Sequence, residues 1–66
     1  MMNVYMMNNE ELAASIKAGE TWLDVEDELK ELCERAGLAD EYKEADGDHV
    51  EDVINRAADI LGVEIY

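Results

Sequence analysis

Four glycines divide this 66-residue chain into segments of helix length, and no proline interrupts any of them. Gly19, Gly37, Gly47 and Gly62 each follow a stretch in which apolar residues recur every three or four positions. That spacing places apolar side chains on one side of an α-helix, and glycine often ends a helix because it adopts left-handed backbone angles without strain. The chain is therefore expected to be mainly α and to form one small domain over residues 1–66.

The first segment predicts a helix over Asn9–Ala18. Asn8 precedes it and can cap it by accepting a hydrogen bond from the backbone of Glu11, whose side chain can reach back to Asn8. The apolar side of this helix is formed by Leu12, Ala13 and Ile16.

The second segment predicts a helix that is capped by Thr21 and ended by Gly37. Leu38 can fold back on Cys33 to complete a Schellman cap at its end. The apolar residues of this helix follow a 3-4-3-4 spacing and form one narrow seam, which consists of Trp22, Val25, Leu29, Leu32 and Ala36. A narrow seam of this kind also suits helices that pair between chains, so a homodimer stays open as an alternative.

Two further segments complete the helical part of the chain. Residues 38–45 have apolar side chains at helical spacing, and either one or two helical turns or a loop would fit. The next helix is clearer, because Asp48 can cap it, Glu51 can complete a capping box, and Gly62 can end it. We therefore expect three helices, or four if residues 38–45 are helical.

The two ends of the chain predict short terminal β-strands. Residues 2–7 are rich in apolar side chains, and residues 63–66 alternate between apolar and polar character. A lone strand leaves its backbone hydrogen-bonding groups unsatisfied, so the two strands are expected to pair with each other. The alternative is that the first residues are frayed.

The charge of the chain limits its partners. Eighteen acidic residues against five lysines and arginines give a formal net charge of −13. Residues 20–52 contain fourteen of the acids and three of the bases, so most of the excess lies there. Direct binding to nucleic acid phosphates or to an anionic membrane is therefore not expected. A basic protein surface or a cation is the complementary partner.

The acids are expected to lie on the solvent side of the helices. Three favourable i, i+4 pairs, Glu26–Lys30, Glu31–Arg35 and Asp52–Arg56, do not cancel the excess. These acids can simply form a solvated surface, but their mutual repulsion in so small a domain favours a binding role. The acids expected to contact a partner are Asp24, Asp27, Glu28, Glu31, Glu34, Asp40, Glu41, Glu44, Asp46 and Asp48.

Other candidate sites are weaker. Asp46, Asp48, His49 and Asp52 are four potential cation ligands within seven residues, but they do not match the EF-hand pattern. We expect no metal or cofactor there, and whether these four residues bind a cation stays open. The chain has one histidine and no nucleophile motif, so an enzyme is not expected.

The single cysteine, Cys33, cannot form an internal disulfide, which fits a reducing compartment. No apolar run approaches the roughly 20 residues of a membrane span. The first ten residues lack the basic and apolar regions of a secretory signal. A cytoplasmic protein is therefore expected.

One segment resembles a known family. The sequence NEELAASIKAGE, from Asn9 to Glu20, is similar to the opening helix of region 2 in small alternative sigma factors. No basic helix follows that could read DNA, so the sigma-factor function is not transferred to this chain.

In size, acidity and absence of catalytic motifs, the chain resembles the small inhibitors encoded by phages and mobile elements, including anti-CRISPR proteins and other DNA mimics. The resemblance is one of class and transfers no individual residue. It implies a non-catalytic inhibitor that covers the basic nucleic-acid-binding surface of a host nuclease or CRISPR-type surveillance complex. The alternative is a helical interaction or assembly module that binds through apolar contacts, with the acids serving only solubility.

Overall fold

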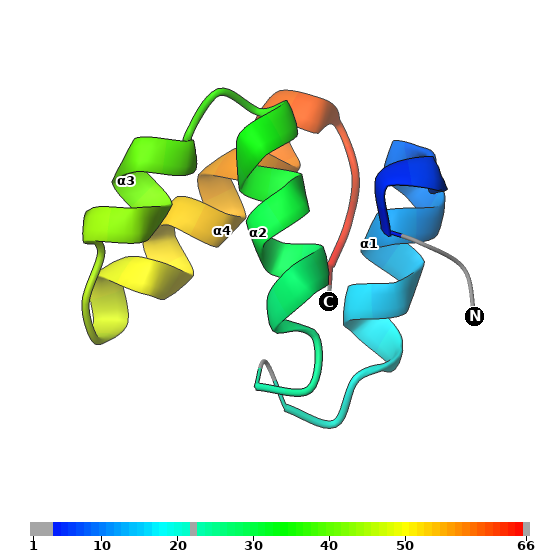
Figure 1. Ribbon diagram of the computed structural model, residues 1–66, viewed down its shortest axis with the longest axis horizontal. Coiled ribbons are helices and arrows are strands. Elements are labelled where there is room, and N and C mark those ends of the chain that lie inside the picture. Colours follow the sequence, from blue (N-terminus) through cyan, green and yellow to red (C-terminus); the bar gives the residue numbers. More distant parts are fainter. Residues whose placement is uncertain (1–3, 22, 66) are drawn as a thin grey trace.

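In the computed structural model, residues 4–21 and 23–65 are described, so the predicted seam position of Trp22 lies outside the described residues. The chain forms a short 3₁₀-helix, η1 (Val4–Met6), and four α-helices. Figure 1 shows α2 between α1 on one side and α3 and α4 on the other. The expectation of a mainly α fold is confirmed, and residues 38–45 do supply a fourth helix. The α-helices are α1 (Asn9–Ala18), α2 (Glu26–Arg35), α3 (Ala39–Glu44) and α4 (Asp48–Leu61).

One hydrophobic core holds the helices together. Each of α1, α2 and α4 turns its apolar side inward, and Tyr42 of α3 packs against the same cluster. Burial of these side chains is the main favourable contribution to folding in a chain of this size. The buried residues are Leu12, Ala13, Ile16, Val25, Leu29, Leu32, Cys33, Leu38, Val53, Ile54, Ala57, Ala58 and Ile65.

Helix α1 has the bounds and the cap that its sequence predicts. The Glu11 backbone N–H donates to Asn8 Oδ1 at 2.8 Å, and the Asn8 backbone N–H donates to Glu11 Oε1 at 3.0 Å. This reciprocal capping box satisfies two donors that the first turn of a helix would otherwise leave free.

Helix α2 begins later than its sequence predicts. Thr21 does not cap it; instead, the Asp24 N–H donates to the Thr21 carbonyl oxygen at 3.1 Å, and the chain turns before entering the helix at Glu26. Val25 is buried beside Gly19, where an added Cβ would lie 2.6 Å from Val25 Cγ1. Close packing therefore requires glycine at position 19. A left-handed backbone is not the reason, because its φ is −70°.

The predicted Schellman cap at the end of α2 is confirmed, and α4 ends in the same way at the predicted Gly62. Gly37 and Gly62 have φ values of 77° and 69°. The Leu38 N–H donates to the Cys33 carbonyl at 2.8 Å, and the Val63 N–H donates to the Ala58 carbonyl at 3.0 Å. A glycine can hold this left-handed position without steric cost, which explains why both helices stop there.

The predicted cap of α4 is wrong. Asp48 is the first residue of the helix rather than its cap, and the cap position is Gly47, with φ 58° and no side-chain hydrogen bond. The backbone N–H groups of His49 and Val50 donate to the carbonyl oxygens of Asp46 and Gly47. These are the N–H groups to which a capping side chain would otherwise have bonded. Asp48 still lies in the first turn, where its negative charge interacts favourably with the helix dipole.

The predicted terminal strands are also wrong over the described residues. Residues 4–6 form η1 and residues 63–65 have no regular structure, so neither described segment is a strand. The apolar residues at the ends instead contribute to the core, since Ile65 is buried in the core cluster and Val4 packs against that cluster. In so short a segment, alternation of apolar and polar residues therefore indicates only that one side of the segment is buried. It does not require a β-strand.

Candidate functional site

The ten predicted contact acids remain the most distinctive group on the surface. Eight of them are exposed, while Glu28 and Glu31 are half-buried. Nine have no basic group within 4 Å among the described residues, and the exception is Glu31, which pairs with Arg35 at 2.8 Å. The exposed eight are Asp24, Asp27, Glu34, Asp40, Glu41, Glu44, Asp46 and Asp48.

Glu31 serves the fold rather than the free surface. Its side chain is 11% exposed and accepts a hydrogen bond from Arg35 Nε. Arg35 also donates through Nη1 to Asn9 Oδ1 and through Nη2 to the Val4 carbonyl, both at 3.1 Å. The Glu31–Arg35 pair therefore fastens η1 and the start of α1 to α2, and Glu31 has less capacity to bind a partner than its neighbours.

The other two predicted i, i+4 ion pairs do not form. Glu26 and Lys30, like Asp52 and Arg56, do not come within 4 Å of each other in the part of the chain that the structure describes. The acidic surface is thus less neutralised by its own bases than the sequence predicts.

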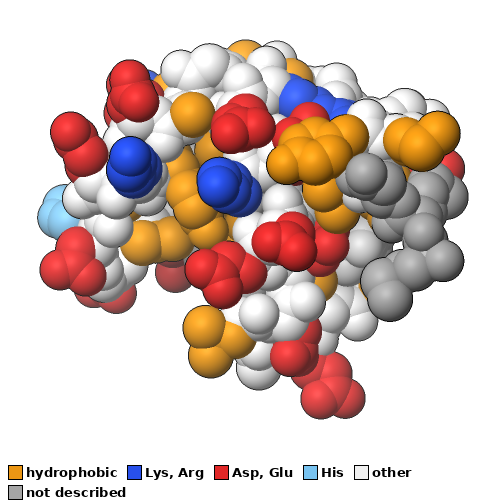
Figure 2. All heavy atoms as spheres, in the orientation of Figure 1, with side chains coloured by type: hydrophobic (Ala, Val, Ile, Leu, Met, Phe, Trp, Pro, Cys, Tyr) orange, Lys and Arg blue, Asp and Glu red, His pale blue; other side chains and the backbone are white. Residues whose placement is uncertain are grey.

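Two lysines interrupt the acidic surface between α2 and α3. A shallow groove of about 390 Å³ is lined by Lys30 and Lys43, together with Glu34, Asp40 and Tyr42. Figure 2 shows basic side chains among the acidic ones in this region. The candidate surface therefore has two acidic parts, one along α2 and one along α3 and the start of α4.

Tyr42 is one of the residues that line this groove. Burial raises the pKa of Tyr42, and the neighbouring Cys33 and Glu26 raise it further. The hydroxyl is therefore protonated at neutral pH and can donate a hydrogen bond.

The potential cation ligands are not brought together. Asp46, Asp48, His49 and Asp52 are all exposed. Among the residues with described positions, no three His, Cys, Asp or Glu side chains form a group that could hold a metal ion.

Cys33 is a core residue. Its side chain is fully buried, and burial raises its pKa to about 11. The thiol is accordingly protonated at neutral pH, whereas nucleophilic attack requires the thiolate.

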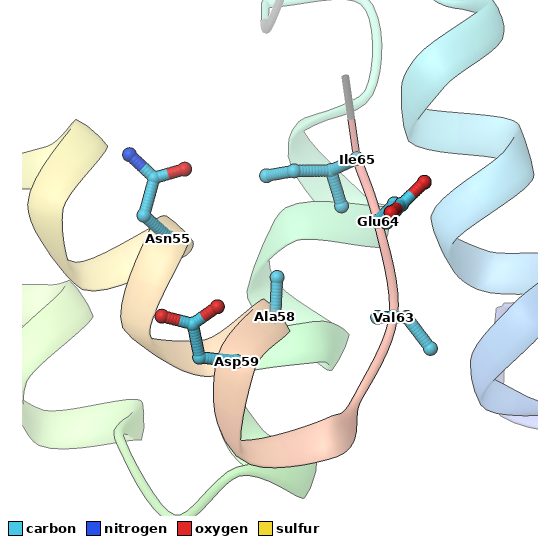
Figure 3. Close-up of a pocket in the computed structure, with 6 residues that line it drawn as sticks. All are labelled: Asn55, Ala58, Asp59, Val63, Glu64 and Ile65. Atoms are coloured by element: carbon cyan, nitrogen blue, oxygen red, sulfur yellow. The ribbon is translucent and has the colours of Figure 1, made fainter.

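A second groove, which the sequence did not indicate, lies between α4 and the C-terminal segment. It has a volume of about 500 Å³ and is lined by Asn55, Ala58 and Asp59 of α4 and by residues 63–65. Figure 3 shows Asn55 and Asp59 on the α4 wall, while Glu64 points to the opposite side of the segment. The groove offers one amide and one carboxylate for hydrogen bonding, and it arises because the chain folds back after Gly62.

The chain matches no family model, no curated protein and no solved structure. Among the helices described here, none is both long and apolar enough to cross a membrane.

The density of unpaired acids predicts that salt stabilises the fold. Neighbouring carboxylates on a helix lie about 5–6 Å apart, which is within the screening length of about 8 Å at physiological salt. Raising sodium chloride from about 20 to 300 mM should therefore raise the melting temperature by about 5 °C or more. The measurement is thermal unfolding followed by circular dichroism.

The same titration with choline chloride and magnesium chloride at equal ionic strength separates screening from specific ion binding. Screening predicts similar stabilisation by sodium and choline. A melting temperature that stays flat in all three salts would contradict mutual repulsion among these acids.

Proposed function

We propose that this protein is a non-catalytic inhibitor that covers a basic nucleic-acid-binding surface through its acidic helices, as a DNA mimic does. The observation that supports this most is the set of nine candidate acids that have no basic partner among residues 4–21 and 23–65, and eight of these acids are exposed. Unpaired like charge is destabilising in the free protein, and a basic partner would relieve it.

The position of the acids on α2 supports mimicry of phosphates. Asp27 and Glu34 lie two turns apart on its outer side, and both are exposed. Phosphates along one strand of a duplex repeat at about 3.4 Å of axis, so a groove that binds them also attracts a row of carboxylates. Complementary charge would also accelerate the encounter of the two proteins.

The proposed partner is a host nuclease or a CRISPR-type surveillance complex whose basic groove normally holds nucleic acid. The protein would act in the cytoplasm and would not bind nucleic acid itself. In this respect it would belong with the small acidic inhibitors of phages and mobile elements.

A second candidate function is a helical interaction module that binds through apolar contacts. It is favoured by four large apolar side chains that the structure leaves exposed: Tyr5, Met6, Leu23 and Ile60. In this case the acids would serve solubility alone.

The salt dependence of binding distinguishes the two functions. The immobilised protein should capture its partner from a bacterial lysate at about 50 mM salt and release it at about 500 mM. With the purified partner, Kd should rise by about tenfold or more between 50 and 200 mM salt. A Kd that changes by less than about twofold over this range would support the apolar module and contradict mimicry.

A further inference from the structure

In the part of the chain that the structure describes, four large apolar side chains are exposed, and three of them adjoin the two ends of α2. Leu23, which is 84% exposed, lies in the turn that enters α2, three residues before the helix begins. Tyr5 and Met6, which are 70% and 78% exposed, belong to η1, and η1 packs against α2. Ile60, which is 56% exposed, lies on α4.

The acidic part of α2 lies between these apolar ends. In Figure 2, acidic side chains lie over and beside α2, and apolar side chains lie near the C-terminal end of α2 and near the turn that precedes it. Between Lys17 and Lys30 the chain has five acids and no base. Lys30, which is exposed and lies one helical turn from both Asp27 and Glu34, interrupts this charge, so the surface combines an excess of negative charge with exposed apolar groups.

Both apolar ends are held in place by contacts with the rest of the fold. Arg35 fastens η1 to α2 through the 3.1 Å hydrogen bond to the Val4 carbonyl. At the other end, Val25 is buried against Gly19, and the Asp24–Thr21 hydrogen bond closes the turn that carries Leu23 outward. A backbone held in this way loses less conformational freedom on binding than that of a mobile loop.

We infer that the outer side of α2, with Leu23 and Met6 at its two ends, is the docking surface, and that it fits a groove for single-stranded nucleic acid. Such grooves combine a basic track for the backbone with aromatic side chains on which bases stack. Asp27 and Glu34 would occupy the basic track, and the two apolar side chains would occupy base-stacking positions. This inference rests on the proposed function and specifies its partner.

A second copy of this chain is a less suitable occupant. Two copies would bring strongly acidic surfaces together, and like charges facing each other cost several kcal/mol at an interface. A partner with a basic track has the complementary charge.

Single substitutions at equally exposed positions test the surface. Leu23→Ser and Met6→Ser each remove one apolar end, and Ile60→Ser removes an exposed apolar side chain on α4 as the matched control. Each protein is immobilised, loaded with nuclease-treated bacterial lysate at about 50 mM salt, and eluted first with single-stranded and then with duplex DNA of about 30 nucleotides.

The expected result is that the parent and Ile60→Ser retain the same proteins and that single-stranded DNA releases them. Leu23→Ser and Met6→Ser should each weaken binding of the purified partner by about tenfold, which is typical of a central apolar contact. The slope of log Kd against log salt should stay unchanged in these two variants and fall in Asp27→Asn, because only the latter removes a charge contact.

Several results would overturn the inference. One is that Leu23→Ser and Met6→Ser bind as Ile60→Ser does while Asp27→Asn still loses affinity, in which case mimicry stands without this surface. The inference also fails if duplex DNA alone releases the partner, or if the immobilised protein retains nothing from the lysate. It fails as well if the parent protein sediments as a dimer and Leu23→Ser and Met6→Ser sediment as monomers. If salt and Asp27→Asn also have no effect, the proposed function fails as well.

Discussion

Reversing four exposed acids to lysine, at Asp24, Asp27, Glu34 and Asp40, is expected to abolish partner capture. Each reversal replaces an attraction to a basic surface with a repulsion, and like charges facing each other are strongly unfavourable. At about 1 kcal/mol for each reversed contact, affinity should fall by about a thousandfold. Kd is measured by titration of the purified partner at low salt.

The matched control reverses four exposed acids that lie outside the candidate surface: Glu10, Asp52, Asp59 and Glu64. Each variant has a formal charge of −5 instead of −13, because four reversals each change the charge by two. Equal losses in the two variants would show that net charge alone attracts the partner. If neither variant loses affinity, the acids do not bind the partner.

Neutralising the two lysines that interrupt the acidic surface should strengthen binding of the partner. Lys30→Gln and Lys43→Gln remove two positive charges that line the groove between α2 and α3. A cationic partner should then bind more tightly, and Lys17→Gln provides the comparison outside this groove.

Replacing Leu32 with alanine is expected to unfold a large fraction of the protein. Leu32 is fully buried in α2, the helix that packs against all the other helices. Leucine-to-alanine changes at such sites cost about 2–5 kcal/mol, and a domain of this size has little more than that in total. The melting temperature should fall by about 10–30 °C.

Thermal and urea unfolding followed by circular dichroism measure this effect. Leu23→Ala makes the same chemical change at a residue that is 84% exposed, and it should alter the melting temperature by only about 2 °C or less. A loss below about 1 kcal/mol for Leu32→Ala would mean that the packing around α2 is loose, in conflict with the buried cluster described above.

Local rules predicted much of the helical part of the fold. The Asn8–Glu11 capping box and the Gly37 and Gly62 caps depend on residues within six positions of one another. Their physical causes, unsatisfied backbone donors and left-handed backbone angles, act within one turn of a helix. Sequence alone is sufficient for features of this kind.

The errors occur where a distant contact outweighs a local preference. Thr21 is a suitable cap, but burial of Val25 against Gly19 moves the start of α2 to Glu26. The apolar residues at the chain ends have strand character, but the core takes up Ile65 and no pairing follows among the described residues. Tertiary packing therefore decided these segments.

For the candidate site, the sequence by itself determined the charge, its concentration in residues 20–52, and the side of each helix that faces solvent. Only the tertiary structure decided which acids are free. Arg35 donates hydrogen bonds to Asn9 and Val4, which precede it by 26 and 31 positions in the sequence. These contacts hold Arg35, and with it Glu31, within the fold. Helical spacing cannot reveal this, because the strength of a charge interaction depends on distances between side chains that only the folded chain brings together.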